Sequence, residues 1–365
     1  MTKAQIAELP DLFQFADGRR VHTVEDWHSR RQELSELIVK IEYGDLPPTP
    51  SGITAEALHT HKAGCFLDAA FTQYRLINND DRAFHFQLDV LVPPGEGPFP
   101  VVLTGDACFR TVTDDITLNI MQRSFILAQF SRTAIVPDIY NSDRTTGLYQ
   151  VYPDGEFGAI AAWAWGYHRC IDFLLTLDQV APDSIAVVGH SRGGKTSLLA
   201  GATDERIALT VPNGSGSGGA GSFYCQGPDS ETLADSKRLI PYWYGPRLWE
   251  FVGKEHEMPF DQHFLKALVA PRAYLSTEGL NDLWSNPSGT WQTHLADREV
   301  YRFLGATDRI GNWYRSGGHD HGTADWNAFL EFMEWQFSGR QPQSRFDQNP
   351  YPDMPAAFSW SAPGE

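Results

Sequence analysis

Apolar and polar positions follow a helical period near the start of the chain and a strand period soon after. Over residues 23–43 the apolar side chains recur every three or four positions, which predicts an amphipathic helix. Thr23 and Asp26 have the spacing of a capping box at its start, and a glycine followed by a proline pair ends it. Over residues 83–92 apolar and polar residues alternate, which predicts a half-exposed strand in an antiparallel edge or hairpin.

From residue 99 onward, short apolar runs without alternation are separated by longer helical patterns. Such runs suit strands covered on both faces, and strands that alternate with helices are typical of a mostly parallel sheet. We therefore predict an α/β fold of the α/β-hydrolase type, with helices on both faces of the sheet and antiparallel strands at its N-terminal edge. The predicted strands are 99–104, 133–136, 184–188, 207–211 and 268–276, with a short run at 312–314, and the predicted helices are 155–178, 191–202, 289–304 and 323–338.

One domain over residues 1–365 accounts for this order, because a chain of this length buries about three quarters of its unfolded surface as a single unit. The stretch 213–260 is rich in glycine, proline and aromatic residues and has weak periodicity. We predict that it is an insertion over the carboxyl edge of the sheet, where such folds place their sites. Residues 341–365 are proline-rich and are predicted to be an irregular tail.

Charge and composition restrict the possible binding partners of the chain but do not decide its fold. The formal net charge of -17 and the isoelectric point near 5.1 argue against nucleic acid or an anionic membrane as the main partner. The four cysteines are scattered and form no CxxC pair, so neither a disulfide framework nor a zinc site of that type is expected. The N-terminal segment lacks the apolar core of a secretory signal, and the sequence as given is expected to be cytoplasmic.

Two motifs overlap in the sequence GHSRGGKT that starts at Gly189. Its first five residues are G-x-S-x-G, the nucleophile elbow, in which a strained turn between a strand and a helix lifts Ser191 above the sheet. The amide of Arg192 then serves as one oxyanion donor. The five-residue segment that starts at Asp106, after a predicted strand, is expected to supply the second.

A hydrolase elbow needs an acid and a histidine later in the chain, in that order. Asp282 follows a predicted strand, and His319 follows a short apolar run and precedes a predicted helix. We therefore predict that Ser191 is the nucleophile, that His319 is its base and that Asp282 orients the imidazole. Glu278, four residues before Asp282, is the reserve acid.

The same eight residues also match G-x-x-x-x-G-K-T, the phosphate-binding loop, with Lys195 on the phosphates and Thr196 on magnesium. That fold needs an apolar strand that ends in Asp for the metal, and the only such run ends at Asp138, upstream of the loop. A nucleotide-binding protein is therefore the alternative from another class. His319 and His321 form an HxH pair, but no partner has a spacing that supports a metal site, so no metal or cofactor is expected.

Arg192 and Lys195 both fall in the first turn of the helix that follows the elbow. Cations there oppose the helix dipole, at a cost of roughly 0.3–1 kcal/mol each. Two such charges beside a nucleophile favour an anionic or hydroxyl-rich substrate. The alternative is that both simply pair with nearby carboxylates.

Seven short runs together carry a family resemblance: GHSRGGK from Gly189, ERIALTVP from Glu205, SGSGG from Ser215, MPFDQH from Met258, ALVAPR from Ala267, DLW from Asp282 and GGH from Gly317. They resemble the glucuronoyl esterases of carbohydrate esterase family 15, over roughly residues 20–340. The resemblance implies an esterase that cleaves esters of glucuronic acid, as found in glucuronoxylan linked to lignin. It also implies that the Arg192 side chain assists the oxyanion, that Lys195 and Trp284 bind hydroxyls of the uronate ring, and that no metal is needed.

Two positions depart from the family pattern. Many members have cysteine before the serine, where this chain has His190, and many carry a catalytic Glu at the position of Gly214. The acid role is thereby left to the later strand end, where Asp282 and Glu278 lie. Since a cytoplasmic enzyme would not meet lignin-bound xylan, the alternative substrates are a smaller uronate ester, an acetylated sugar or another carboxylic ester cleaved by the same triad.

Overall fold

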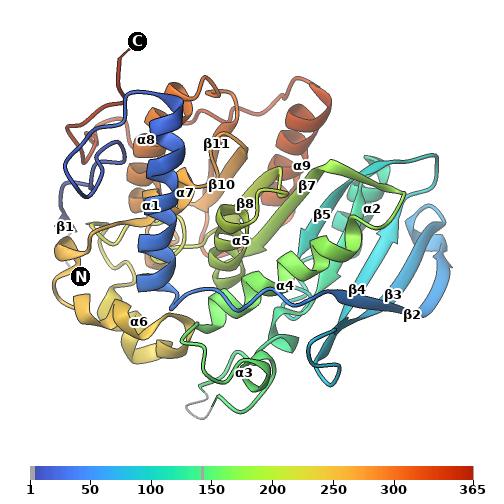
Figure 1. Ribbon diagram of the computed structural model, residues 1–365. Helices are drawn as coiled ribbons and strands as arrows, with labels where there is room; N and C mark the ends of the chain where they lie inside the picture. Colours follow the sequence, from blue (N-terminus) through green and yellow to red (C-terminus); the bar gives the residue numbers. More distant parts are fainter. Residues whose placement is uncertain (1–4, 141–143, 365) are drawn as a thin grey trace.

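The computed structural model describes residues 5–140 and 144–364, and a nine-stranded mixed sheet runs through its centre (Figure 1). The strand order is β11-β10-β8-β7-β5-β6-β4-β3-β2. The part from β11 to β6 is parallel, whereas β4, β3 and β2 add antiparallel strands at the N-terminal edge, which confirms the predicted fold. The strands are β2 (Ile53–Ala63), β3 (Ala69–Asn78), β4 (His85–Val92), β5 (Phe99–Thr104), β6 (Ile126–Phe130), β7 (Val180–His190), β8 (Leu209–Asn213), β10 (Ala273–Gly279) and β11 (Ile310–Arg315).

Helices cover both faces of this sheet, as Figure 1 shows, and each face has its own buried apolar core. One layer contains α1 (Val24–Glu42), α4 (Ala159–Leu174), α5 (Arg192–Thr203), α7 (Gln262–Ala267) and α8 (Pro287–Phe303), and the other contains α2 (Asp114–Gln122) and α9 (Thr323–Ser338). Shorter elements are α3 (Leu148–Val151), α6 (Leu233–Leu239) and the pair β1 (Gln5–Ile6) and β9 (Cys225–Gln226). Within the described residues, no helix combines the length and apolarity that a membrane crossing requires.

The first helix shows how directly the sequence pattern sets an element. The Thr23 hydroxyl accepts a hydrogen bond from the amide of Asp26, and the Asp26 carboxylate accepts one from the amide of Thr23, which forms the predicted capping box. Trp27, Leu34 and Ile38 lie on its buried face. The predicted helix over residues 23–43 is therefore confirmed within one residue at each end.

The predicted strand at 133–136 is wrong. The strand is β6, and residues 132–134 form a 3-10 turn. Both segments contain buried apolar residues, but only β6 pairs with a strand on each side, β5 and β4. Ile135 and Val136 enter the core from a turn, so apolarity alone did not distinguish a strand from a buried turn.

Other boundaries shift by a few residues. The strand predicted at 207–211 is β8, two residues later, and the strand predicted at 268–276 is β10, because residues 268–272 form the turn that follows α7. The helix predicted at 155–178 is the shorter α4, and α2 was not predicted.

Two irregular regions frame the carboxyl edge of the sheet. The predicted insertion at 213–260 contains a buried glycine-rich loop, β9, α6 and several 3-10 turns. The described part of the tail has no helix or strand of its own, and Asn312 of β11 forms a bridge with Asp347 there. Residues 1–4, 141–143 and 365, which the single-domain prediction includes, lie outside the described residues.

Candidate active site

Ser191 lies at a tight turn between β7 and α5. Its φ is +56°, a conformation that residues other than glycine rarely adopt. A Cβ at Gly189 would lie 2.2 Å from the carbonyl oxygen of Gly193, and a Cβ at Gly193 would lie 2.1 Å from Asp106 Oδ1. Both flanking positions therefore need glycine, and the G-x-S-x-G spacing is a steric requirement of this turn.

His319 and Asp282 come from the loops that follow β11 and β10. His319 Nδ1 lies 2.5 Å from Asp282 Oδ2 and 3.1 Å from Ser285 Oγ. Burial raises the pKa of Asp282, but hydrogen bonds from His319 and Ser285 outweigh burial and hold this pKa below its usual value. An Nδ1–H donated to this carboxylate leaves Nε2 of the imidazole free to accept a proton.

One cavity of about 550 Å³ brings the serine and the histidine to the same space. Its wall includes His190, Ser191 and Arg192 from the elbow and His319 from the loop after β11. Phe109, from the loop after β5, lines the same cavity. Three strand ends far apart in the sequence therefore deliver side chains to one edge of the sheet.

Glu278, the reserve acid, is buried in the core on β10. Burial, and then the negative charge of Asp282, raise the pKa of Glu278 well above its usual value, which disfavours its charged form. Asp282 is the carboxylate that contacts His319.

Gly214 stands beside this pair, at the end of β8. A Cβ at Gly214 would lie 3.6 Å from both His319 Nδ1 and Asp282 Oδ2. The ends of β8 and β10 therefore face the same edge of the imidazole. With glycine at 214, Asp282 occupies that edge without a competing carboxylate.

Arg192 and Lys195 each have a carboxylate partner, which is the alternative that the sequence left open. Arg192 Nη1 lies 2.7 Å from Asp138 Oδ2, and Lys195 Nζ lies 3.5 Å from Glu231 Oε2. Lys195 is almost fully buried and also donates to two carbonyl oxygens of the loop 215–217, the first at 2.7 Å. The negative charge of each carboxylate offsets the unfavourable interaction of its cation with the positive end of the helix dipole.

The contacts of Lys195 and Thr196 do not form the phosphate-binding loop that the sequence offered as an alternative. The ammonium of Lys195 is occupied beneath the loop 215–217, and Thr196 Oγ1 donates to the carbonyl of Arg192 at 2.8 Å. Both groups are therefore engaged by the protein rather than arranged for a phosphate and its magnesium ion, and Asp138 is bound to Arg192. The nucleotide-binding alternative is therefore not supported.

The HxH pair does not form a metal site either. His321 is buried and stacks on Trp326, with ring centroids 4.9 Å apart, and on His190, at 5.7 Å. In the part of the chain that the structure describes, no group of three or more histidine, cysteine, aspartate or glutamate residues could hold a metal ion.

Asp106 lies under the elbow rather than in the cavity. Its amide donates to Thr104 Oγ1 at 3.2 Å, and its carboxylate accepts from the amide of His190 at 2.7 Å and pairs with Arg132. The predicted oxyanion role of Asp106 is therefore contradicted, because its backbone donor is already in use. The carboxylate instead braces the turn that carries Ser191.

Sequence reasoning missed the surroundings of His190. Asn213 Oδ1 lies 2.6 Å from His190 Nδ1, and the ring of His190 lies 4.5 Å from that of His319. Burial, and then His319, lower the pKa of His190 to about 4, so this second imidazole is neutral beside the first at neutral pH. The one available signal was a polar residue, Asn213, at the end of a buried apolar strand.

Trp284 lies in the 3-10 turn directly after Asp282, and its side chain is 46% exposed. Its carbonyl oxygen accepts a hydrogen bond from the amide of Glu231 at 3.0 Å. Glu231, which the sequence did not single out, thereby connects Trp284 to Lys195. These three residues border the loop that carries the acid.

The family model for "Glucuronyl esterase, fungi" matches residues 76–305. The 4-O-methyl-glucuronoyl methylesterase of Podospora anserina is 31% identical over 353 residues, which is 91% of this chain and 69% of that protein. The enzyme of the same name from Cerrena unicolor is 32% identical over 86% of this chain and 66% of its own length. The chain thus spans about two thirds of the length of these relatives.

Solved structures agree with this similarity. A carbohydrate esterase family 15 glucuronoyl esterase from Caldicellulosiruptor kristjansonii has a TM-score of 0.84 at 31% identity and covers 98% of both chains. A promiscuous esterase of the same family from a marine bacterial metagenome has a TM-score of 0.81 at 27% identity, over 92% of this chain and 98% of that one.

Proposed function

This chain belongs to the glucuronoyl esterase family, carbohydrate esterase family 15, and we propose that it hydrolyses a glucuronic acid ester with Ser191 as nucleophile. One observation carries the proposal: the His319 imidazole, bound to Asp282, opens onto the cavity that Ser191 lines. The names of the relatives, methylesterases of 4-O-methyl-glucuronate, support the substrate class. The reaction is that of a carboxylic ester hydrolase.

Acylation begins when Ser191 Oγ attacks the ester carbonyl while His319 Nε2 takes the hydroxyl proton. Asp282 keeps Nδ1 as a donor and stabilises the imidazolium that forms. The oxyanion of the tetrahedral intermediate is stabilised by the amide and the guanidinium of Arg192. The C–O bond to the alcohol then breaks, and the alcohol leaves with the proton from His319.

Deacylation repeats these steps with water. His319 takes a proton from water, whose oxygen attacks the acyl carbon, and a second tetrahedral intermediate forms over the same donors. The bond to Ser191 Oγ breaks, the serine regains its proton from His319, and the free uronate leaves.

The proposed contacts of the uronate ring are Lys195 and Trp284, which Glu231 connects beside the loop that carries Asp282. Trp284 is about half exposed, and its carbonyl oxygen accepts from the amide of Glu231, whose buried carboxylate pairs with Lys195. Because Lys195 already holds two loop carbonyls, a substrate hydroxyl would share its ammonium rather than find it free. Its role is then both to bind substrate and to fix the loop 215–217.

A panel of esters tests the proposal. Wild-type protein should hydrolyse methyl glucuronate with a higher kcat/KM than acetylated xylose or nitrophenyl acetate, and Ser191→Ala should lose turnover while its melting temperature stays near that of wild type. Preference for acetylated xylose would point to an acetyl-sugar esterase, and preference for nitrophenyl acetate to a general carboxylesterase. Activity retained by Ser191→Ala would exclude the mechanism.

A further inference from the structure

Asp138 is an acidic residue that the mechanism above does not use, although it pairs with Arg192, the residue that follows the nucleophile. It follows the buried turn after β6, far in the sequence from the elbow, and its side chain is only 10% exposed. Its Oδ2 lies 2.7 Å from Arg192 Nη1. The guanidinium of Arg192, the residue after the nucleophile, is therefore bound to the nearly buried carboxylate of Asp138.

The other oxygen of Asp138 is held as well. Tyr242 Oη donates to Oδ1 at 2.9 Å, and Trp243 Nε1 donates to the same oxygen at 3.0 Å. Two neutral donors from one 3-10 turn thus fix the orientation of the carboxylate without neutralising it. A carboxylate fixed in this way holds the opposite guanidinium in one geometry.

Aromatic rings restrict the guanidinium further. The Arg192 guanidinium carbon lies 4.8 Å from the ring centre of Trp243 and 5.5 Å from that of Phe109. Phe109 lines the cavity of Ser191, whereas Trp243 is buried. The long arginine side chain, free to sample many rotamers in water, is therefore confined at the cavity wall.

A second arginine connects this pair to the base of the elbow. Arg132 is fully buried, pairs with Asp106, and has Nη2 3.9 Å from Asp138 Oδ2. Asp106 accepts the amide hydrogen of His190, the residue before the nucleophile. The carboxylates on the two sides of the elbow therefore share one buried cation.

We infer that Asp138 is a positioning residue, which holds the Arg192 guanidinium where it meets the oxyanion formed at Ser191. The inference rests on the proposed function, because it assigns Asp138 a role through Arg192 in that reaction. A preorganised donor stabilises a transition state without reorganisation at the moment of reaction. Loss of the carboxylate leaves the guanidinium present but no longer fixed.

A double-mutant cycle tests this inference. Asp138→Asn should lower kcat by about 10–100-fold while KM changes by less than about threefold, because the donor acts mainly in the transition state. In the Arg192→Ala background, the same Asp138→Asn change should lower kcat by less than about twofold. Asp138→Glu, which keeps the charge, should recover part of the lost kcat.

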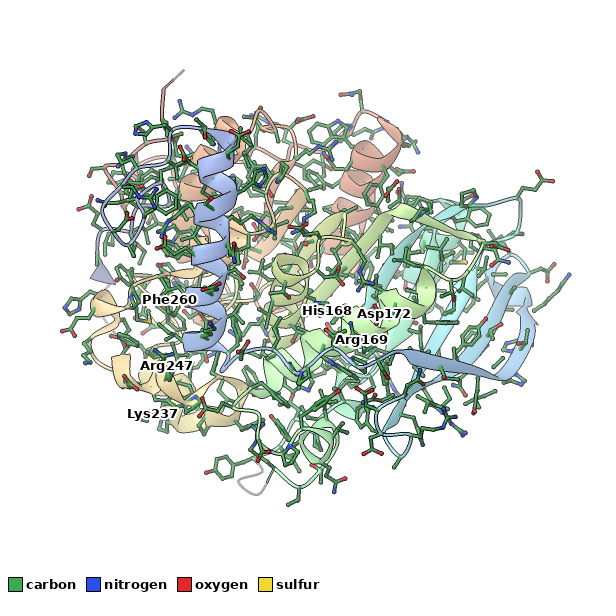
Figure 2. The ribbon with its side chains drawn as sticks, viewed as in Figure 1. His168, Arg169, Asp172, Lys237, Arg247 and Phe260 are labelled. Atoms are coloured by element: carbon green, nitrogen blue, oxygen red, sulfur yellow. The ribbon has the colours of Figure 1, made fainter. Side chains whose placement is uncertain are left out.

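The matched control is Asp172 on α4, labelled in Figure 2 next to Arg169. Asp172 also has two arginine partners, Arg169 and Arg206, each at 2.7 Å, so Asp172→Asn makes the same chemical change away from the site. It should leave kcat within twofold of wild type. Where Asp138→Asn does not fold, Tyr242→Phe removes one donor to Asp138, and its smaller loss of kcat should likewise vanish in the Arg192→Ala background.

Equal effects of Asp138→Asn in both backgrounds, or an unchanged kcat, would overturn the inference. The cycle is measured with whichever ester of the panel the wild type hydrolyses fastest. Failure of the glucuronate ester in that panel would contradict the proposed substrate, while the cycle on nitrophenyl acetate would still decide the role of Asp138. The two failures are therefore distinguishable.

Discussion

At the scale of single residues, the carboxyl groups of Glu278 and Asp282 show that surroundings in the fold decide the role of a side chain. Asp282 gains hydrogen bonds from His319 and Ser285 that lower its pKa, whereas burial raises the pKa of Glu278 well above its usual value. The first is therefore suited to orient an imidazolium as an anion, whereas burial of the second disfavours its charged form. The two side chains have similar chemistry in water, and only their surroundings in the fold separate them.

Substitution of each acid tests this division. Asp282→Asn should lower kcat by about 10²–10⁴-fold, because an amide cannot hold the imidazole in the required tautomer or stabilise its charged form. Glu278→Gln should change kcat by less than about threefold, since Glu278 has no contact with His319. Steady-state kinetics on the two variants, with melting temperatures as a folding control, give the comparison. A large loss confined to Glu278→Gln would reverse the assignment.

At the scale of elements, parallel strands deliver their carboxyl ends to one edge of the sheet. The order of serine, acid and histidine along the chain was readable because each follows a strand, and the structure places His319 against Asp282 and in the cavity of Ser191. The strained turn at Ser191 also follows from its glycine spacing. Local pattern was sufficient for these features because they depend on neighbours in the sequence.

Features that depend on distant contacts could not be predicted. The 133–136 segment was mistaken for a strand because sheet pairing, not apolarity, selected β6. The oxyanion role predicted for Asp106 fails because its amide donates to Thr104, a contact with no sequence signal. The carbonyl partners of Lys195 come from an irregular loop and could not be predicted either. Pairing of Arg192 with Asp138 joins segments 54 residues apart and has no sequence signal.

The ends of β8 and β10 both face His319, and this arrangement allows a prediction at the scale of elements. In Asp282→Ala, adding Gly214→Asp should raise kcat at least about tenfold over Asp282→Ala alone, because a Cβ at 214 would lie 3.6 Å from His319 Nδ1. Aspartate tolerates the positive φ of +47° at this position better than most residues. Gly214→Asn in the same background is the control, and an equal gain from asparagine would show that charge at 214 does not act on the base.

For the molecule as a whole, buried ionisable groups tie stability to pH. His168 on α4, labelled in Figure 2, is buried and bonded to the carbonyl oxygen of Ala200 at 3.3 Å. Burial lowers the pKa of His168 to about 4, and burial also lowers the pKa of His263 to about 3. These imidazoles fold in the neutral form, so the folded state binds fewer protons than the unfolded chain in mild acid.

The predicted cytoplasmic location and the single-domain boundary stay predictions.

The pH dependence of unfolding follows from these directions. For His168, whose folded pKa lies below the unfolded value of 6.5, the stabilising contribution is complete above pH 6.5 and is lost as pH falls toward 4. The free energy of unfolding of wild type should therefore fall by roughly 1–3 kcal/mol more than that of His168→Gln between pH 7 and pH 4. Urea titrations at several pH values measure the difference. Parallel pH profiles for the two proteins would show that folding does not lower the pKa of His168.

The most direct test of the account is the reaction of Ser191 with an aryl phosphonate ester, followed by the release of the aryl alcohol and by peptide mass spectrometry. Wild-type protein should carry one phosphonyl group, on Ser191, and His319→Ala should react at least about 100-fold more slowly because no base takes the serine proton. Modification of a different residue, or equal rates in the two proteins, would contradict the claim that His319 activates Ser191.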